Sequence, residues 1–580
     1  MYIFDRTFHP DEANQAFTTG RLLETGTYRY DPQDHHGPTL YYAAAALQKA
    51  TGHDSTATLD GTLLRCTPLL FAALALVFGF LAIRKITKRT WLGLLFALLL
   101  GTSPIFVFFA TDFIQEMLLA SFTMMMFWTA TNYLLYTTPS APQTSQTSQT
   151  PQTSQTPHTP QTSQTPQTFK KTTWALLFGI ATGLAFATKE TALLTFAAAG
   201  IATLLVFLLQ KRPPSQSSTT NYQLPTTNYH LPSTIYHLPT LLALAGFLLT
   251  ATLLYSSFGA NWQGVYNAFI AAPLSYIHRA IGSTTSPGAA AHIHPWWQYL
   301  EWLFLGKAHI TQCHIGGTAP NMTAGALALG WCAIPLLFRG IRQKITPSLL
   351  HAASFLTLYT TILLAFYSAI PYKTPWCTLQ IHIGYLAASF VGFLIFGELI
   401  ALLQHWLKNM DSGAFSRGWR PISEKTLSSI IATVAVANVI AVEYGPQLTS
   451  LIRDPNSKEL PYNYAAASPQ VKELATLVLS TINSKLQTSN SKLPTTNSFA
   501  AVALPPEDTW PLPFYLRAVG DKIGYWSSFG ELEALAGLGG KPDVVVVPAE
   551  EGHRVQPLFP HLKNTKRFEM RPHVRVRAFW

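Results

Sequence analysis

An acidic pair stands near the start of the chain, Asp11 and Glu12 in the stretch His9-Pro10-Asp11-Glu12, just ahead of the first long apolar stretch. A carboxylate held at a membrane surface can take a proton from a hydroxyl group, so either residue could act as a general base. Acidic residues after a proline also favour the first turn of a helix, and in isolation that structural explanation is the stronger one. The position of the pair beside the polar groups described next favours catalysis.

Two further clusters carry polar side chains between apolar stretches. His35 and His36 precede a Gly-Pro turn, and they are interpreted either as loop histidines or as ligands of a phosphate or sugar hydroxyl. Asp112, Gln115 and Glu116 have helical spacing at the end of two apolar stretches. Ionisable groups within spans are costly and tend to mark function, although Asp112 could simply cap a helix.

Two lysines complete the set of candidates. Lys189 and Glu190 are almost the only charges between Trp174 and Gln210, which fits a solvated turn or a phosphate-binding lysine at membrane depth. Lys373 lies in the aromatic stretch Tyr372-Lys373-Thr374-Pro375-Trp376. It could reach the membrane interface as a snorkelling side chain, or it could neutralise a departing phosphate.

Metal chemistry has little support in the sequence. On a strand, His292 and His294 would place both imidazoles on one face, but no carboxylates accompany them at a fixed spacing. We retain both as candidate substrate-binding residues. The four cysteines form no CxxC pair, so neither a disulfide framework nor a thiolate zinc site is indicated. We predict no cofactor; a divalent metal is possible but unsupported.

The elements that must position these groups are membrane spans. Of 580 residues, 48% are hydrophobic and only 12% are charged, about half the charged share of a soluble protein. Stretches long enough to cross a bilayer recur along the chain, so we predict a mainly α-helical, polytopic bundle of about ten spans. The predicted spans are 62–83, 91–110, 114–136, 173–188, 190–209, 240–258, 323–338, 348–370, 377–404 and 427–444.

The net charge of +11 is distributed as a topological signal rather than as a nucleic-acid footprint. The basic residues cluster in short loops that all fall on one side if the spans alternate, and the positive-inside rule makes that side cytoplasmic. The candidate residues then emerge together on the other side of a cell (inner) membrane. The clusters are Arg84, Lys85, Lys88 and Arg89; Lys170 and Lys171; Lys211 and Arg212; Arg339, Arg342 and Lys344; and Lys408, Arg417, Arg420 and Lys425.

Composition also divides the chain. Residues 1–444 read as the membrane domain, with two Pro/Ser/Thr/Gln-rich inserts, 137–172 and 211–240, that we predict to be disordered. Residues 445–580 alternate short strand and helix patterns and predict a small extracytoplasmic α/β domain. Met1–Arg6 resembles the end of a missing first helix.

Taken in order, these motifs resemble the membrane-embedded glycosyltransferases of the GT-C class. The likeness is to the protein O-mannosyltransferases that use dolichyl-phosphate mannose, and it is closest to a bacterial and archaeal branch named for association with flippase activity. The stretches that carry it are His9–Glu12, His36–Pro38 with Tyr41-Tyr42, Phe113–Glu116, Ala187–Glu190, His294–Trp297, Tyr372–Trp376 and Trp510–Arg517.

The resemblance implies inverting transfer of a sugar from a polyprenyl-phosphate donor to a lipid, glycan or protein acceptor. The family's acidic residue in the first external loop corresponds to Asp11, with Glu12 beside it. Two other functions stay open. Lysine and glutamate within the membrane could line a transport path for a lipid-linked sugar, or the protein could be a non-catalytic accessory whose C-terminal domain recruits partners.

Overall fold

The computed structural model describes most of the chain, and the structural statements below concern these residues. They are 2–32, 36–135, 165–210, 233–275, 292–305, 344–410, 423–456, 466–488, 498–571 and 574–580. The predicted span 323–338, the candidate His35 and most of the two predicted disordered inserts lie outside them.

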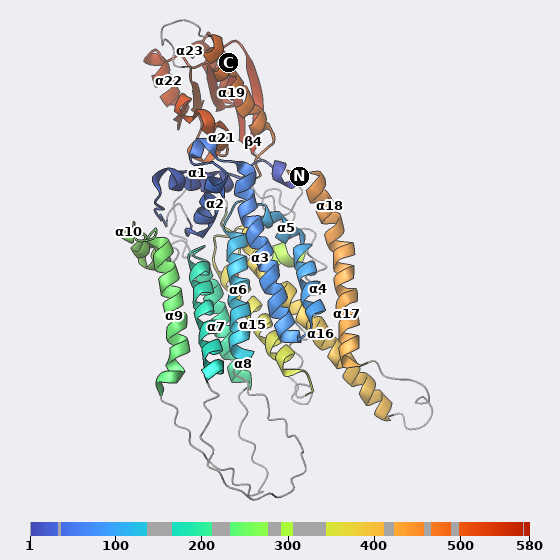
Figure 1. Ribbon diagram of the computed structural model, residues 1–580. Coiled ribbons are helices and arrows are strands. Elements are labelled where there is room, and N and C mark those ends of the chain that lie inside the picture. The colour runs from blue at the N-terminus through green and yellow to red at the C-terminus, as the bar shows by residue number, and fades with distance from the viewer. Residues whose placement is uncertain are drawn as a thin grey trace, which may run out of the picture.

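A bundle of long helices forms the body of the protein (Figure 1). Within the described residues, six helices are long and apolar enough to cross a membrane, or seven if α4 and α5, bent by 72°, make one span. The predicted polytopic helical fold is confirmed. The bundle as a whole, including helices outside that count, is made of α3 (Gly61–Thr87), α4 (Thr90–Gly101), α5 (Pro104–Ala110), α6 (Glu116–Leu135), α7 (Thr165–Phe186), α8 (Ala192–Gln210), α9 (Ser233–Tyr255), α15 (Pro347–Ala369), α16 (Thr378–Met410) and α17 (Glu424–Asn438).

Apolar residues on the outside of the bundle explain why these helices need a membrane. Leu70 and Leu74 on α3, and Leu204 and Phe207 on α8, are among the large apolar side chains left exposed. Soluble proteins rarely expose apolar patches of this extent. Lipid would cover this surface, while small and aromatic residues fill the contacts between helices.

Two short helices lie across one end of the bundle, beneath the C-terminal domain (Figure 1). These are α1 (Pro10–Thr25) and α2 (Thr39–Ala50). α1 begins with a capping box: the His9 ring accepts the Asp11 N–H at 3.1 Å, and the Glu12 carboxylate accepts the His9 N–H at 2.9 Å. The helix-initiating role considered for the acidic pair is therefore real.

The turn between α7 and α8 packs against the start of α2. At Gly37, an added Cβ would lie 2.3 Å from the carbonyl oxygen of Ala187, so only glycine fits. The Thr39 N–H donates to the same carbonyl at 3.2 Å, and the Thr39 and Thr188 hydroxyls are 2.8 Å apart. The stretch 173–209 is thus two helices joined by a short turn.

The last helix of the bundle runs further than the sequence indicated. α17 continues through a π-helical stretch, Val439–Tyr444, into α18 (Gly445–Arg453). The predicted boundary at 444/445 therefore falls inside a continuous helix, because the apolar pattern weakens before the backbone leaves the helical conformation.

The C-terminal domain is the predicted α/β unit. Its sheet has the strand order β2-β1-β3-β5-β4, with β1, β2 and β3 parallel and the last two strands antiparallel. Helix α19 packs against one face and α22 against the other. The bounds are α19 (Gln470–Thr488), β1 (Ala500–Ala503), α20 (Pro506–Thr509), α21 (Leu512–Leu516), β2 (Ile523–Trp526), α22 (Phe529–Gly537), β3 (Val544–Pro548), α23 (Val555–Leu558), β4 (Thr565–Arg571) and β5 (Val574–Phe579).

The described members of the predicted basic clusters lie on elements at the end of the bundle opposite the C-terminal domain, where α3 ends and α17 begins (Figure 1). Arg84 and Lys85 lie in the last turn of α3. Arg89 donates to the carbonyl of Lys425 at 2.8 Å, so two of the predicted clusters meet in space. These clusters thus share one end of the bundle, as the sequence suggested.

Candidate functional site

A cavity of about 500 Å³ lies at the end of the bundle that carries α1 and α2. Its wall combines side chains from α1, the turn before α6, the α7–α8 turn, α9 and the segment after α15. Six of the residues selected from the sequence line it, although they come from separate parts of the chain: Asp11, His36, Gln115, Glu116, Lys189 and Glu190.

Apart from Asp11, the charged residues of the cavity wall are paired. The Lys189 ammonium donates to the Glu116 carboxylate, and both side chains are buried. Glu190 accepts from the Tyr30 hydroxyl at 2.5 Å and contacts His36 Nδ1 at 2.8 Å. The first contact joins the start of α6 to the α7–α8 turn, and the second joins the α1–α2 loop to the same turn. Together these contacts fix the shape of the cavity.

Amides and aromatic rings make up much of the remaining wall. The Gln115 side chain donates to Gln15 at 3.0 Å and to the Tyr41 hydroxyl at 3.2 Å. Tyr255, Tyr299, Tyr367, Tyr372 and Trp376 also line the cavity. Carboxylates and amides can hydrogen-bond hydroxyl groups while aromatic faces pack on C–H surfaces, which suits a carbohydrate.

Asp11 is the accessible carboxylate of the acidic pair. Its side chain is 48% exposed, and one oxygen lies 3.8 Å from His9 Nδ1. His9 is partly buried, and this burial lowers the pKa of its imidazole. The Asp11 carboxylate therefore faces the cavity beside a neutral ring, free to meet a substrate hydroxyl.

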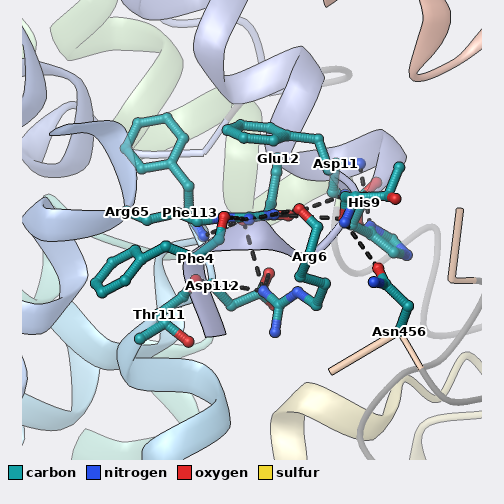
Figure 2. Close-up of polar contacts among 12 residues, drawn as sticks. Phe4, Arg6, His9, Asp11, Glu12, Arg65, Thr111, Asp112, Phe113 and Asn456 are labelled. Carbon is teal, nitrogen blue, oxygen red and sulfur yellow. Dashed lines mark hydrogen bonds and ion pairs between the residues drawn. The ribbon is translucent and has the colours of Figure 1, made fainter. Parts of the chain in front are cut away.

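Glu12 faces the other way and is fully buried (Figure 2). Arg65 binds it through two hydrogen bonds of 2.8 and 2.6 Å, and the Phe113 N–H donates to it at 2.9 Å. Burial by itself raises the pKa of this carboxyl, but Arg65 and Arg6 outweigh burial and bring the pKa to about 2. Glu12 is thus placed as a structural anion rather than as a base.

Asp112 belongs to the same buried group as Glu12. Arg6 donates to its carboxylate at 2.7 Å and lies 3.7 Å from Glu12 (Figure 2). We call Arg6, Glu12, Arg65 and Asp112 the outer charge cluster. None of the four is among the residues that line the large cavity, so Asp112 supports the loop instead of contacting a ligand there.

Lys373 is also turned away from the cavity, unlike the expectation of a phosphate ligand. Its ammonium donates to the carbonyls of Ser368, at 2.9 Å, and Ile370, and its side chain is buried. Lysine commonly satisfies the free carbonyls at a helix C-terminus in this way. It therefore caps α15, and its neighbours Tyr372 and Thr374 reach the cavity instead.

The two histidines of the predicted pair lie on a single bridge beside this segment. Ile293 pairs with Tyr372 in antiparallel fashion, and the His292 ring packs on the Tyr372 ring at 4.8 Å. Neither His292 nor His294 lines the large cavity. In the part of the chain that the structure describes, no group of three or more His, Cys, Asp or Glu could hold a metal ion.

Three residues that sequence reasoning did not select hold candidate residues in place around the cavity: Arg6, Arg65 and Tyr30. Arg65 lies inside the first apolar stretch, and an isolated charge in a span is itself a functional signal. Tyr30 carries no such signal, since its role depends on the distant Glu190.

Residues 41–255 match the family model described as dolichyl-phosphate-mannose-protein mannosyltransferase. The structure is similar to ArnT from Cupriavidus metallidurans, bound to undecaprenyl phosphate, with 14% identity, a TM-score of 0.50 and coverage of 100% of this chain and 95% of that one. Against the apo form of the same protein, the identity is 13% and the TM-score 0.52, with 99% and 94% covered. The comparison with curated proteins found no match.

At these identities the likeness to ArnT establishes the fold. The chain has the GT-C fold that its motifs predicted, and the family match over residues 41–255 supports a membrane glycosyltransferase.

Proposed function

We propose that this protein transfers a sugar from a polyprenyl-phosphate donor to an acceptor hydroxyl at the non-cytoplasmic face of the membrane. The observation that carries the proposal is that Asp11 and Lys189, which are far apart in sequence, line one cavity. The cavity lies at the end of the bundle away from the described basic clusters, which is the external end under the positive-inside rule.

In the proposed reaction, Asp11 is the general base. It takes the proton of the acceptor hydroxyl as the acceptor oxygen bonds to the anomeric carbon of the donor sugar. The bond from that carbon to the phosphate oxygen breaks, and the lipid phosphate leaves with the bonding electron pair. Attack opposite the leaving phosphate inverts the anomeric carbon.

Lys189 is the cation that we assign to the leaving phosphate. Its ion pair with Glu116 holds the ammonium in place before substrate binds, so that little reorganisation accompanies the reaction. Glu190, His36 and Gln115 are proposed to bind sugar hydroxyls from the same wall. Lys373 and Glu12 have no direct role in this scheme.

The nature of the donor rests on the relatives. The matched family is named for a dolichyl-phosphate-linked mannose, and one ArnT structure holds undecaprenyl phosphate. Both are polyprenyl phosphates, so we propose a donor of that class, with no nucleotide.

Replacing Asp11 with Asn tests the assignment directly. The amide keeps the size of the side chain but cannot take a proton, so we expect turnover to fall by about 10²–10⁴-fold. Transfer of labelled sugar from a polyprenyl-phosphate donor in proteoliposomes measures it. Asp54→Asn, an exposed residue at the same end, is the matched control. Unchanged transfer by the Asp11 variant would remove this residue from the mechanism.

A further inference from the structure

One segment of the C-terminal domain contacts the loop that carries Asp11. This docking segment, Trp510–Arg517, contains α21. Phe514 stacks on Phe8 with ring centres 4.1 Å apart and planes 20° from parallel. The Tyr515 hydroxyl accepts the Phe8 N–H at 2.9 Å. The domain therefore fixes both the side chain and the backbone of Phe8.

The docking segment also holds the region on the far side of Asp11. Trp510 packs edge-on against Phe17 of α1, with ring centres 5.5 Å apart. Arg517 donates to the carbonyl of Leu59, just before α3 begins. The docking segment thus contacts Phe8, before Asp11, and Phe17, after it. The first half of α1 is therefore packed against the domain.

The single turn of α21 belongs to two hydrophobic cores at once. Leu512 and Leu516 are buried among the residues of α19 and the sheet. Phe514 is buried among Phe8, Ala13 and other residues around α1. A shift of α1 relative to the domain would open one of these cores, so the two are coupled by packing.

A short chain of contacts leads from Tyr515 to the Asp11 carboxylate. Phe8 precedes His9, whose ring accepts the Asp11 N–H. The Phe8 ring also covers the Arg65 guanidinium at 4.3 Å, and Arg65 holds Glu12. Fixing Phe8 therefore fixes the cap of α1, and the cap sets where Asp11 points.

We propose that the C-terminal domain is a structural part of the transfer site, with Tyr515 and Phe514 as positioning residues for Asp11. The inference rests on the proposed role of Asp11 as base. It gives the Trp510–Arg517 motif a function and makes the domain more than a module for recruiting partners.

The first test is Tyr515→Phe, which keeps the ring and removes the acceptor of the Phe8 N–H. Small misplacements of a catalytic group can cost about 10²-fold, so we expect kcat to fall by roughly tenfold with donor KM unchanged. Tyr525→Phe, the same change on an exposed tyrosine of the same domain, should leave kcat as it is. A kcat for Tyr515→Phe equal to that of the control would overturn the proposal.

The second test separates positioning from general destabilisation. In an Asp11→Asn background, Tyr515→Phe should add little further loss, because the group that it positions is already gone. The same fold loss in both backgrounds would mean that Tyr515 acts without Asp11, which contradicts the inference.

Hydrogen exchange provides a readout without catalysis. Amides of residues 8–13 should exchange faster in Tyr515→Phe than in Tyr525→Phe, and unchanged exchange there would also overturn the proposal. If Asp11→Asn keeps full turnover while this exchange increases, the assignment of the base fails but the docking contact stands.

Discussion

Two neighbouring carboxylates occupy opposite kinds of site. Asp11 lines an open cavity and is half exposed, whereas Glu12 is buried among Arg65, Arg6 and two backbone N–H groups. In the outer charge cluster every charge is neutralised by a partner, and the cluster holds the loop together. The comparison teaches that the surroundings, not the residue type, decide which carboxylate remains available for proton transfer.

Breaking the outer charge cluster should produce the largest effect on stability. Arg65→Met leaves the Glu12 carboxylate buried with its main partner gone, which costs about 3–5 kcal/mol. Thermal unfolding in detergent measures the loss. Arg554→Met removes an arginine from an exposed pair with Glu533 and should cost less than about 1 kcal/mol. Equal stability of the two variants would refute the role of the cluster.

Acid should weaken the cluster in a defined range. The pKa of Glu12 is about 2 in the folded protein and its ordinary value is 4.5. Its ionised form therefore stabilises the fold fully above the higher value, and this contribution declines as the pH falls toward the lower one. Unfolding midpoints measured between pH 6 and pH 3 should drop more steeply for the wild type than for Glu12→Gln. Parallel curves would contradict the assignment.

Among the cations, Lys373 and Lys189 differ in the same way as Glu12 and Asp11: Lys373 is bound to backbone carbonyls, whereas Lys189 lines the cavity. Lys373→Met leaves the carbonyls at the end of α15 without their donor, at a cost of about 1–3 kcal/mol, and donor KM should stay unchanged. Lys49→Met, at an exposed position on α2, is the control for loss of charge. A raised donor KM with unchanged stability would instead restore the phosphate-binding interpretation that the sequence suggested.

Much of the bundle follows from the sequence because uncharged stretches of spanning length have few alternatives to a membrane helix. The antiparallel strands β4 and β5 were not predicted, although Val574, Val576 and Ala578 alternate with arginines in β5 as in a half-buried strand. The alternation in β5 covers only six residues and includes two arginines, so it did not stand out as a strand.

The candidate site was only partly predictable. The predicted topology places Asp11, Glu116 and Lys189 on the same side of the membrane. That was enough to predict a common site, because groups at one end of a bundle can converge. The topology could not show that Asp11 is accessible while Glu12 is buried in an ion pair, since that difference depends on Arg65, which lies on another helix. Nor could it give the direction of Lys373, which is set by the carbonyls that end α15.

The contact of Gly37 with the carbonyl of Ala187 has a consequence for how a substrate enters. No side chain fits between the loop bearing His36 and the turn bearing Lys189, so packing couples these two walls. We therefore expect the cavity to widen at its other margin, which Tyr299, Tyr372 and Trp376 line. For the proposed polyprenyl-phosphate donor, we expect entry from the side of the bundle, between those aromatic rings.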